Sequence, residues 1–338
     1  EDEAAANHIA IFKGVISEVS VLPVLTIEAD EKRSNSPAGV VFDNTFYLHR
    51  ASRYANPLNT ADRLPVVYGD LTDGAEGIWV LPCIDTVNHV YCYADHPVLS
   101  ANSISIYSGG VEVPSVVASL AIVDASCIES NGTYALIFTG ANVTPATGTY
   151  TIAGNTITAV SLISGGTGYL QPPTVATQTT DGSITASVNY TFNSSNYFEP
   201  PVPPPAIHLS SENIATITFT SSQGTNVITA RGKGKVFFPI TLAGEIMIEN
   251  IIDIVNDFLT SENDFTSDIF EANKYAQAKQ IFERSSYKAA GVIHQDGTIW
   301  DIITSMMSSF LGSAYLNGAG KLALEIDDGT IDLFSAGA

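Results

Sequence analysis

The chain has 338 residues, of which 45% are hydrophobic, and its 14 lysines and arginines are outnumbered by 35 aspartates and glutamates, giving a formal net charge of −21. This length favours two or three domains, and the hydrophobic fraction is large enough to fill their cores, which argues against wholesale disorder. No apolar run approaches the roughly 20 residues that a membrane-spanning helix needs. We therefore expect no transmembrane segment.

The charge is unevenly distributed along the chain. Residues 64–230 contain no lysine or arginine. A nucleic-acid-binding surface must neutralise phosphates with cations, so this half of the chain cannot supply one, and we expect it to repel DNA and to stay well solvated. Its acidic residues are Asp70, Asp73, Glu76, Asp85, Asp95, Glu112, Asp124, Glu129, Asp181, Glu199 and Glu212.

The first 113 residues have the pattern of antiparallel β-structure. Apolar and polar residues alternate over short runs within 9–28 and 40–49, as in strands with one buried face. A strand is expected over 64–70, and a tight hairpin over 104–113 turns at Ser108-Gly-Gly110.

A further hairpin is predicted from strands over 77–85 and 90–94. If residues 86–89 form a four-residue loop, Asp85 pairs with Val90, and Cys83 then lies directly opposite Cys92.

Residues 115–198 differ in character from the preceding part. Ser, Thr, Gly and Ala dominate, and short runs of strand character alternate with Gly-rich turns. The clearest strands are 148–152, 156–163 and 185–192. We interpret the stretch as a small β-sandwich inserted as a module, which ends at the polyproline run Glu199-Pro-Pro-Val-Pro-Pro-Pro205.

Strands return over 215–220 and 227–230, and the basic run 231–235 interrupts them. Helical periodicity appears only after Gly244. It predicts helices over 251–259, capped by Asn250, over 267–282, and over 299–311 with Thr298 and Asp301 as a capping pair. We expect Gly312 to end the last helix and a strand hairpin over 314–326 to pack on it. The stripe expected to be buried on that helix is Trp300, Ile303, Met307, Phe310 and Leu311.

These patterns predict a mainly β protein with an α+β C-terminal part, in which an antiparallel β-barrel or sandwich framework carries an inserted small β-sandwich. The expected divisions are residues 1–114 as the first part of the framework, 115–198 as the inserted module, 199–206 as a proline-rich linker, 207–245 as the return strands of the framework, and 246–338 as the helix-containing domain.

Cys83, His89, Cys92 and His96 are the residue types of a zinc site. Their spacing matches no common finger or ribbon, and the expected register turns the cysteines toward each other and leaves the histidines elsewhere. We interpret them as core or surface residues. A cross-strand disulfide would be strained, and three cysteines are too few for a disulfide framework.

We interpret three other motifs as structural and not as ligand-binding. Arg231-Gly-Lys-Gly-Lys235 lacks the spacing of a phosphate loop, so we interpret it as a basic hairpin tip or an interface strand. Asp327-Asp-Gly-Thr-Ile-Asp332 lacks the ligand spacing of an EF-hand, which favours a solvated turn. Trp300, Met306 and Met307 are expected in the core and not in a cofactor pocket.

The sequence contains no nucleophile elbow, no His-Glu-x-x-His and no dinucleotide-binding glycine motif. Two carboxylates for glycoside hydrolysis could come from any two strands, and nothing selects a pair. We therefore predict that the protein is not an enzyme and has no catalytic, cofactor-binding or metal site and no cofactor.

Asn-x-Ser/Thr sequons begin at Asn131, Asn142, Asn189 and Asn193. They support an alternative function, a secreted or cell-surface β-domain adhesin that binds carbohydrate, although chance supplies several in a Ser/Thr-rich region. The chain begins Glu-Asp-Glu-Ala without Met or a signal region, so we expect it to be processed or to be part of a longer polypeptide.

Three stretches occur in a suggestive order. The first is Leu64-Pro-Val-Val-Tyr-Gly-Asp70, followed by Tyr91-Cys-Tyr-Ala-Asp-His-Pro97 and the hairpin over 104–113. The second is the predicted helix over 250–260, and the third is the helix and hairpin over 297–324. In this order they resemble the hub proteins at the tail tip, or baseplate, of long-tailed bacteriophages and prophage-derived tail particles. Here Ser-Gly-Gly replaces the Asp-Gly turn of those hubs, and the Pro at the first position of the second stretch's helix is missing.

The resemblance covers residues 9–113 and 213–332, and the segment Gly165-Gly-Thr-Gly-Tyr through Pro-Pro-Thr-Val175 separately resembles small β-modules of phage tail and fibre proteins. It implies a structural virion protein, a homotrimeric ring below the tail tube that connects the tube to fibres or a spike and passes DNA. The partners it implies are tail tube or distal tail proteins, tail fibre or spike proteins, and the tape-measure protein, without sequence-specific nucleic-acid binding. The location it implies is the tail tip of the virion, after assembly in the bacterial host cytoplasm.

Overall fold

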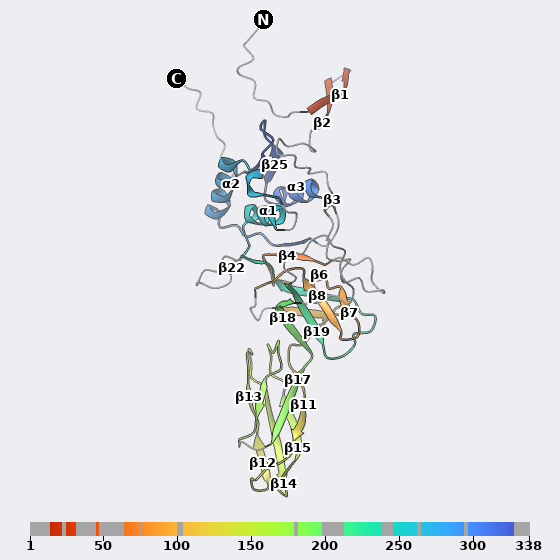
Figure 1. The fold of residues 1–338 in the computed structure, drawn as a ribbon, viewed down its shortest axis with the longest axis vertical. Helices are drawn as coiled ribbons and strands as arrows, with labels where there is room; N and C mark the ends of the chain where they lie inside the picture. The colour runs from red at the N-terminus through yellow and green to blue at the C-terminus, as the bar shows by residue number, and fades with distance from the viewer. Residues whose placement is uncertain are drawn as a thin grey trace. The chain divides into compact units, whose positions relative to one another are not determined.

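A computed structural model of the chain describes residues 14–21, 25–31, 45–46, 64–74, 76–99, 104–178, 182–197, 213–237, 246–261, 265–293 and 297–327. These residues form mainly antiparallel β-sheets with a C-terminal helical part (Figure 1), which confirms the predicted mainly β fold class. The chain divides into two compact units, one made of Glu1–Tyr47, Glu249–Ala289 and Gln295–Ala338, and the other of Leu48–Ile248 and Ala290–His294.

The second unit contains a β framework of two sheets. One has the order β10 (Val111–Val113), β9 (Ser105–Ser108), β20 (Ile228–Lys233) and β5 (Asp70–Leu71), and β6 (Trp79–Val80) also pairs with β20. The other has the order β18 (Tyr190–Tyr197), β19 (Asn213–Phe219), β8 (Val90–Ala94) and β7 (Cys83–Asp85). The hairpin predicted over 104–113 is confirmed, because β9 pairs with β10 around Gly109 and Gly110, which both have positive φ.

One aromatic-rich cluster takes side chains from both framework sheets. Trp79 meets Tyr93 edge-on at 5.1 Å between ring centroids, and Tyr93 meets Phe192 in the same way at 5.2 Å. The polar ends are satisfied, since Trp79 Nε1 donates to the Tyr93 carbonyl and the Tyr93 hydroxyl donates to the Lys233 carbonyl, both at 3.1 Å. Large aromatic side chains can therefore be buried here without leaving a polar atom unpaired.

Two short pairings add to the same unit. β4 (Val66–Tyr68) pairs with β23 (Gly291–Ile293), and β21 (Val236–Phe237) pairs with β22 (Ile246–Met247). β23 comes from a distant part of the chain, and the sequence pattern did not predict it.

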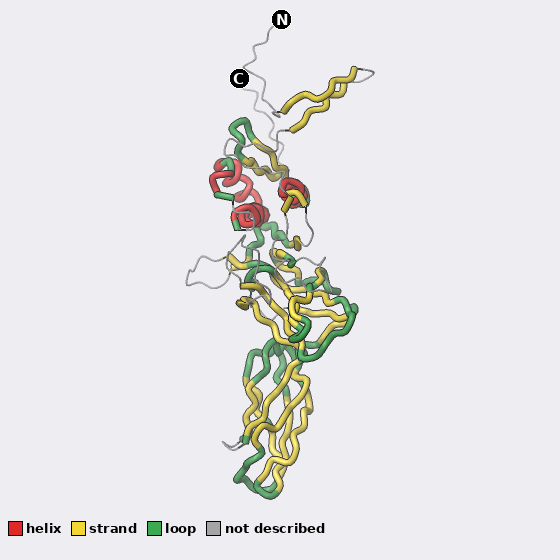
Figure 2. The backbone as a smooth tube through the Cα atoms, turned by 45° about the vertical axis from the view of Figure 1, so that its right-hand side comes forward, coloured by secondary structure: helices red, strands yellow, loops and turns green. Residues whose placement is uncertain are grey.

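The inserted module has its own two sheets, whose strands run side by side in Figure 2. One sheet has the order β11 (Val117–Asp124), β17 (Ser183–Val188), β16 (Thr174–Ala176) and β13 (Ile137–Thr139). The other has the order β12 (Gly132–Ala135), β14 (Thr147–Ala153) and β15 (Thr156–Ser164). Two small clusters of buried side chains, centred on Tyr150 and Tyr169, fill the space between the sheets.

The strand predicted over 185–192 is divided at Asn189. β17 stays in the module, whereas β18 pairs with β19 in the framework. Asn189 stabilises the crossing, because its side chain donates to the Pro114 carbonyl at 2.8 Å and its own carbonyl accepts from Thr220 N at 3.1 Å. The predicted proline-rich linker at 199–206 lies outside the described residues.

The first unit contains α1 (Ile251–Thr260), the 3₁₀ turn η3 (Ser267–Ile269), α2 (Ala272–Arg284), α3 (Ile299–Ser308) and the hairpin β25 (Gly312–Leu316) and β26 (Leu322–Ile326). It also holds the pairs β1 (Gly14–Val21) with β2 (Leu25–Glu31) and β3 (Thr45–Phe46) with β24 (Gly297–Thr298).

Both predicted N-caps are present in this unit. Asn250 Oδ1 accepts from Ile252 N at 2.9 Å, and Thr298 Oγ1 accepts from Asp301 N at 3.0 Å. The apolar face of α1 is buried as its periodicity predicts: Ile251, Ile252, Ile254, Val255, Phe258 and Leu259.

Two boundaries were predicted wrongly. The helix predicted over 267–282 starts as η3, and α2 begins only after Phe270, which is extended and bridges Leu322. The helix predicted to reach residue 311 ends at Ser308, and Leu311 has a φ of 55° and is 78% exposed, so it does not belong to the buried stripe. Gly312 opens β25 and does not end the helix directly. A side chain does not fit there, because a Cβ would lie 2.8 Å from the Glu325 carbonyl oxygen.

Candidate functional site

The basic run Arg231–Lys235 does not form a hairpin tip. Its first three residues are the last three of β20, which pairs with β9 on one side and with β5 and β6 on the other, and Gly234 and Lys235 lie beyond its end. The glycines fit because there is no room for side chains. A Cβ at Gly232 would lie 2.3 Å from the Tyr93 hydroxyl, and one at Gly234 would lie 2.6 Å from the Val67 carbonyl oxygen. They serve close packing and do not form a loop that could hold a phosphate.

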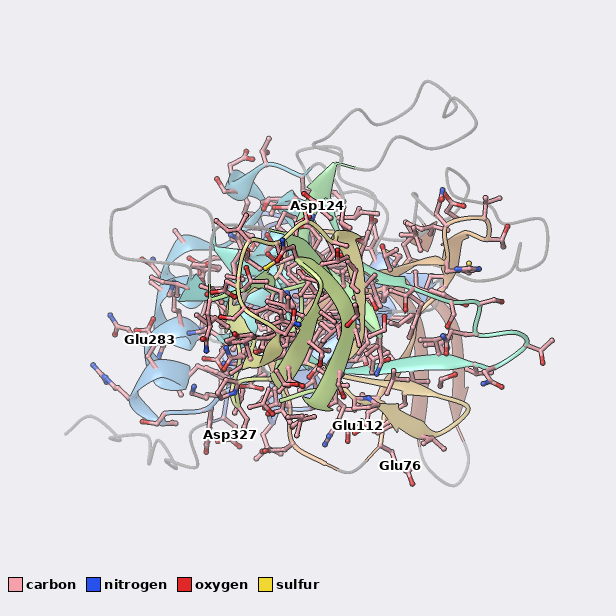
Figure 3. The ribbon with its side chains drawn as sticks, turned by 90° about the horizontal axis from the view of Figure 1, so that it is seen from below. Glu76, Glu112, Asp124, Glu283 and Asp327 are labelled. Atoms are coloured by element: carbon pink, nitrogen blue, oxygen red, sulfur yellow. The ribbon has the colours of Figure 1, made fainter. Side chains whose placement is uncertain are left out.

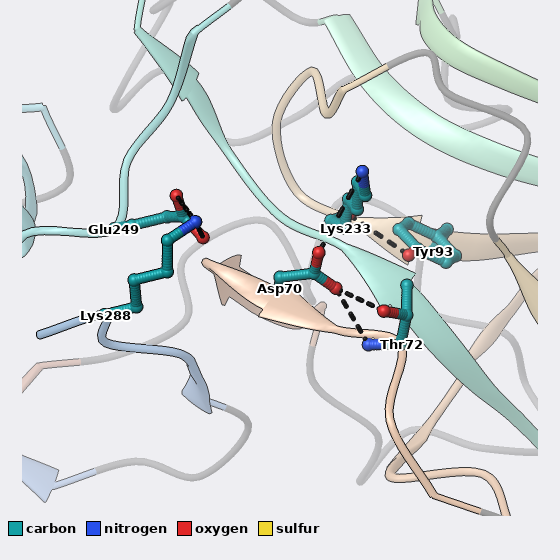
Figure 4. A network of polar contacts seen from close by, with 6 residues as sticks. All are labelled: Asp70, Thr72, Tyr93, Lys233, Glu249 and Lys288. Atoms are coloured by element: carbon teal, nitrogen blue, oxygen red, sulfur yellow. Dashed lines mark hydrogen bonds and ion pairs between the residues drawn. The ribbon is translucent and has the colours of Figure 1, made fainter. Parts of the chain in front are cut away.

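Each cation of this run is engaged within the fold. The Arg231 guanidinium lies 5.5 Å from the centroid of the Tyr107 ring, and Lys235 Nζ lies 6.0 Å from that of Tyr68. Lys233 Nζ lies 3.9 Å from Asp70 Oδ2. Figure 4 shows this ion pair as a dashed line. Each of the three cations therefore has a partner within the fold, and all three residues are partly exposed.

The partners of these cations were not predicted from the sequence. Tyr107 and Asp70 lie far from the basic run along the chain, on β9 and β5, which only the folded sheet brings beside β20. Tyr68 lies on β4, whose Val67 carbonyl accepts from Lys235 N. The spacing of residues along the chain does not indicate these contacts. They could be predicted only from the correct order of the strands.

Other acidic side chains of the β region are not balanced in this way. Glu76, Glu112 and Asp124 are exposed, and none of them forms an ion pair with another described residue (Figure 3). Hydrogen bonds from Ser126 lower the pKa of Asp124. Burial works against ionisation of Asp85, but hydrogen bonds from Asn88 and Val87 lower its pKa. The outward charge of this region is therefore negative at neutral pH.

The inserted module carries almost no charge. Asp124, Glu129 and Asp181 are the charged residues of the sequence between 114 and 198. Asp124 closes β11 and Glu129 lies in the loop that follows, while Asp181 lies outside the described residues. The exposed side chains along the strands are mostly Ser, Thr and Ala, and one row across the larger sheet is Thr139, Thr174 and Thr185.

The stretches 64–70 and 91–97, which carry the first part of the resemblance, lie directly against each other. Val67 N donates to His96 Nε2 at 2.9 Å, and Asp95 N donates to the Pro65 carbonyl at 2.8 Å. Because Nε2 accepts a hydrogen bond, the ring proton of His96 is on Nδ1, which lies 3.0 Å from the Pro97 carbonyl. His96 is 4% exposed and serves to join these two stretches.

The four residues considered for zinc are not brought together. Asp85 pairs with Val90 as expected, but the register shifts between Asp85 and Cys83, so Cys83 lies opposite Tyr91 and the predicted Cys83–Cys92 pairing is wrong. The irregularity adds a residue to β7, a change that alternation alone does not reveal. All three cysteines are free thiols.

Burial raises the pKa of the Cys83 thiol, and burial together with the adjacent Cys83 raises the pKa of Tyr91 to about 12. Cys83 is therefore mostly a protonated thiol at neutral pH and a poor nucleophile. Across the residues that the structure describes, no group of three or more His, Cys, Asp or Glu side chains could hold a metal ion.

Two clefts of about 230 Å³ each occur in the described regions. One, in the first unit, lies between α2 and the hairpin β25–β26, and the other lies where the module loops at Gly140 and Gln171 approach Phe192. Both are smaller than the pockets that usually bind drug-sized ligands. Trp300 and Met307 are buried as predicted for core residues, and Met306 is partly buried. Asp327 is exposed, and the rest of that acidic turn lies outside the described residues.

The asparagine side chains of two sequons form hydrogen bonds within the fold. Asn142 Nδ2 donates to the Gly140 carbonyl and Asn189 Nδ2 to the Pro114 carbonyl, both at 2.8 Å. A glycan attaches through this nitrogen, so modification would disturb both contacts. Asn131 and Asn193 are exposed.

No family model, no curated protein and no solved structure matches the chain. Among the residues with described positions, no helix combines the length and the apolar character needed to cross a membrane.

Proposed function

We propose that the chain is a structural virion protein, a subunit of the tail-tip or baseplate hub ring of a long-tailed bacteriophage or a prophage-derived tail particle. The ring connects the tail tube to fibres or a spike and passes DNA or the tape-measure protein. The chain acts by assembly and carries out no catalysis.

The charge distribution is the observation that supports this proposal most. In the β region, Arg231, Lys233 and Lys235 are engaged within the fold, while exposed acids such as Glu76 and Glu112 have no ion pair among the described residues. A surface of this kind gives DNA few cations with which to replace its counterions. A protein that lines or borders a DNA passage must not hold the DNA, and an acidic surface meets that need.

The open strand edge of β10 gives further support for an assembling subunit. Among the described strands, β10 pairs only with β9, and Val111 on it is 71% exposed. An edge strand leaves backbone N–H and C=O groups unpaired, so it can pair with another chain. In a closed ring, the edge of one subunit is covered by its neighbour.

Sedimentation velocity of the full chain, alone and mixed with tail-tube protein, tests the proposal. We expect a trimer alone and a larger complex in the mixture. We expect Val111→Lys on the open edge to weaken the trimer, whereas Ile128→Lys, at a residue that is 84% exposed in the module, should leave it unchanged. A preparation that stays monomeric at about tens of micromolar, well above the Kd of stable oligomers, and does not bind tail-tube protein would contradict the proposal.

The intact mass of the protein from its natural source separates this proposal from the adhesin alternative. The hub proposal expects the mass of an unmodified chain. Added hexose masses that disappear in Asn131→Gln or Asn193→Gln would instead favour the secreted adhesin.

A further inference from the structure

The loop Gly165–Gln171 of the module sends neighbouring side chains into two different cores. Tyr169 is fully buried in the cluster at the base of the module, with Val117, Ala146 and Val188. Leu170 belongs to the aromatic cluster of the framework, with Phe192 among its members. One short segment is therefore anchored in both cores.

The glycines of the loop allow this segment to lie against its neighbours. Gly166 and Gly168 have φ values of 65° and 79°, which favour glycine. A Cβ at Gly166 would lie 2.3 Å from the Thr144 carbonyl oxygen, and one at Gly165 would lie 2.5 Å from that of Val117. Any larger residue at these positions would push the loop away from the base of the module.

Hydrogen bonds fix the loop to both parts. On the module side, the Tyr169 hydroxyl accepts from Ala146 N at 2.8 Å. On the framework side, the Leu170 carbonyl accepts from Phe192 N at 2.9 Å, along the outer edge of β18, and Gln171 Nε2 donates to the Phe192 carbonyl at 2.6 Å. The same loop thus completes the module base and covers a framework edge strand.

We propose that the loop Gly165–Gln171 is a lock that couples the inserted module to the framework, so that the two open as one cooperative unit. The chain itself crosses between them only at residues 113–117 and 188–190. Two crossings alone would leave a module with its own cores free to unfold separately. The lock adds a third attachment, with Leu170 as the side chain that unites the cores.

Hydrogen exchange with peptide-level mass spectrometry on the full chain tests this inference. In the natural chain, the most protected amides of β14 in the module and of β8 in the framework should exchange at the same limiting rate, since both require the same opening. In Leu170→Ala, the two limiting rates should separate by about tenfold or more. Leu136→Ala is the matched control, since Leu136 is equally buried but belongs only to a module cluster. It should raise both rates together.

Gln171→Ala removes a single hydrogen bond of the lock and keeps the inference testable if Leu170→Ala does not fold. It should separate the two rates in the same direction by a smaller factor. The inference is overturned if the natural chain already shows two separate limiting rates. It is also overturned if the rates stay equal in every folded variant of the lock.

Discussion

The β region and the helical unit differ in how far their charged side chains are paired. In the helical unit, lysines and acids from different elements meet in pairs, with Lys279 Nζ 2.7 Å from Asp253 Oδ1 and Lys288 Nζ 3.0 Å from Glu249 Oε2, the latter visible in Figure 4. In the β region, most of the sequence has no cation at all. Balanced charge is what an ordinary surface shows, so the acidity of the β region is the feature that needs a functional explanation.

The difference also shows what holds each part together. Exposed ion pairs contribute little to stability, so the helical unit depends on the buried face of α1, including Phe258, and gains only small increments from its pairs. The framework depends on its aromatic cluster around Trp79 and Tyr93. Its acids repel one another and are tolerated because that core is large.

The largest expected effect comes from the framework core. Trp79→Ala should lower the free energy of unfolding of the β region by about 3–5 kcal/mol, since it removes a side chain that is 2% exposed and leaves a cavity. Chemical denaturation, with hydrogen exchange as the probe of each region, measures this loss. Amides of α1 should keep their protection. An equal loss of protection in both units would contradict the conclusion that separate cores stabilise them.

The helical unit should respond to the loss of a helix cap. Asn250→Ala removes the acceptor for Ile252 N and should cost about 1 kcal/mol. Asn256→Ala, within the same helix, is the control and should change stability by less than about 0.5 kcal/mol. Both are measured by denaturation in the Trp79→Phe background, where Trp300 is the remaining tryptophan and reports on this unit.

Salt should affect the two regions with opposite signs. Raising sodium chloride from about 0.05 to 0.5 M shortens the Debye length severalfold, which screens the repulsion among acids of the β region and the attraction within pairs of the helical unit. We expect the β region to gain about 1 kcal/mol and the helical unit to lose less than that. Single-tryptophan variants retaining Trp79 or Trp300 report each region separately. A loss of stability in the β region would contradict the charge distribution described above.

The smallest expected effect belongs to a single ion pair. The hydrogen bond from Lys274, 2.5 Å from Glu325 Oε1, lowers the pKa of Glu325, and burial opposes this shift only in part. A lowered pKa means that the pair stabilises the fold above the ordinary glutamate value of about 4.3, and that this contribution disappears as pH falls through the folded value.

Glu325→Gln should therefore cost about 0.5 kcal/mol at pH 7 and nothing at pH 2.5, because both side chains of the pair are about two-fifths exposed. Glu283→Gln, which removes an exposed carboxylate without an ion pair among the described residues, is the matched control and should change nothing at either pH. A cost for Glu325→Gln that persists at low pH would mean that the pair is not its source.

Local signals in the sequence predicted local structure well. The caps at Asn250 and Thr298, the apolar face of α1 and the hairpin predicted over 314–326 depend on residues within a few positions of one another, and all are present. The strand-rich framework and the inserted strands also followed from alternation and glycine-rich turns.

Long-range pairing could not be predicted in the same way. β23 pairs with β4 from more than 200 positions away, and Leu170 joins a core that its own neighbours do not share. The register of Cys83 depends on one irregular residue in β7. For the candidate site, the sequence located the acids but not the internal partners of Arg231 and Lys233, which depend on strand order.

Immunogold electron microscopy of tail particles, with antibodies raised against the inserted module, tests the central claim most directly. We expect gold label on intact particles at the fibre-bearing end of the tail tube, and peptides of this chain among the proteins of the purified particle. Particles that lack both the label and the peptides, while the chain is found on the cell surface, would contradict it.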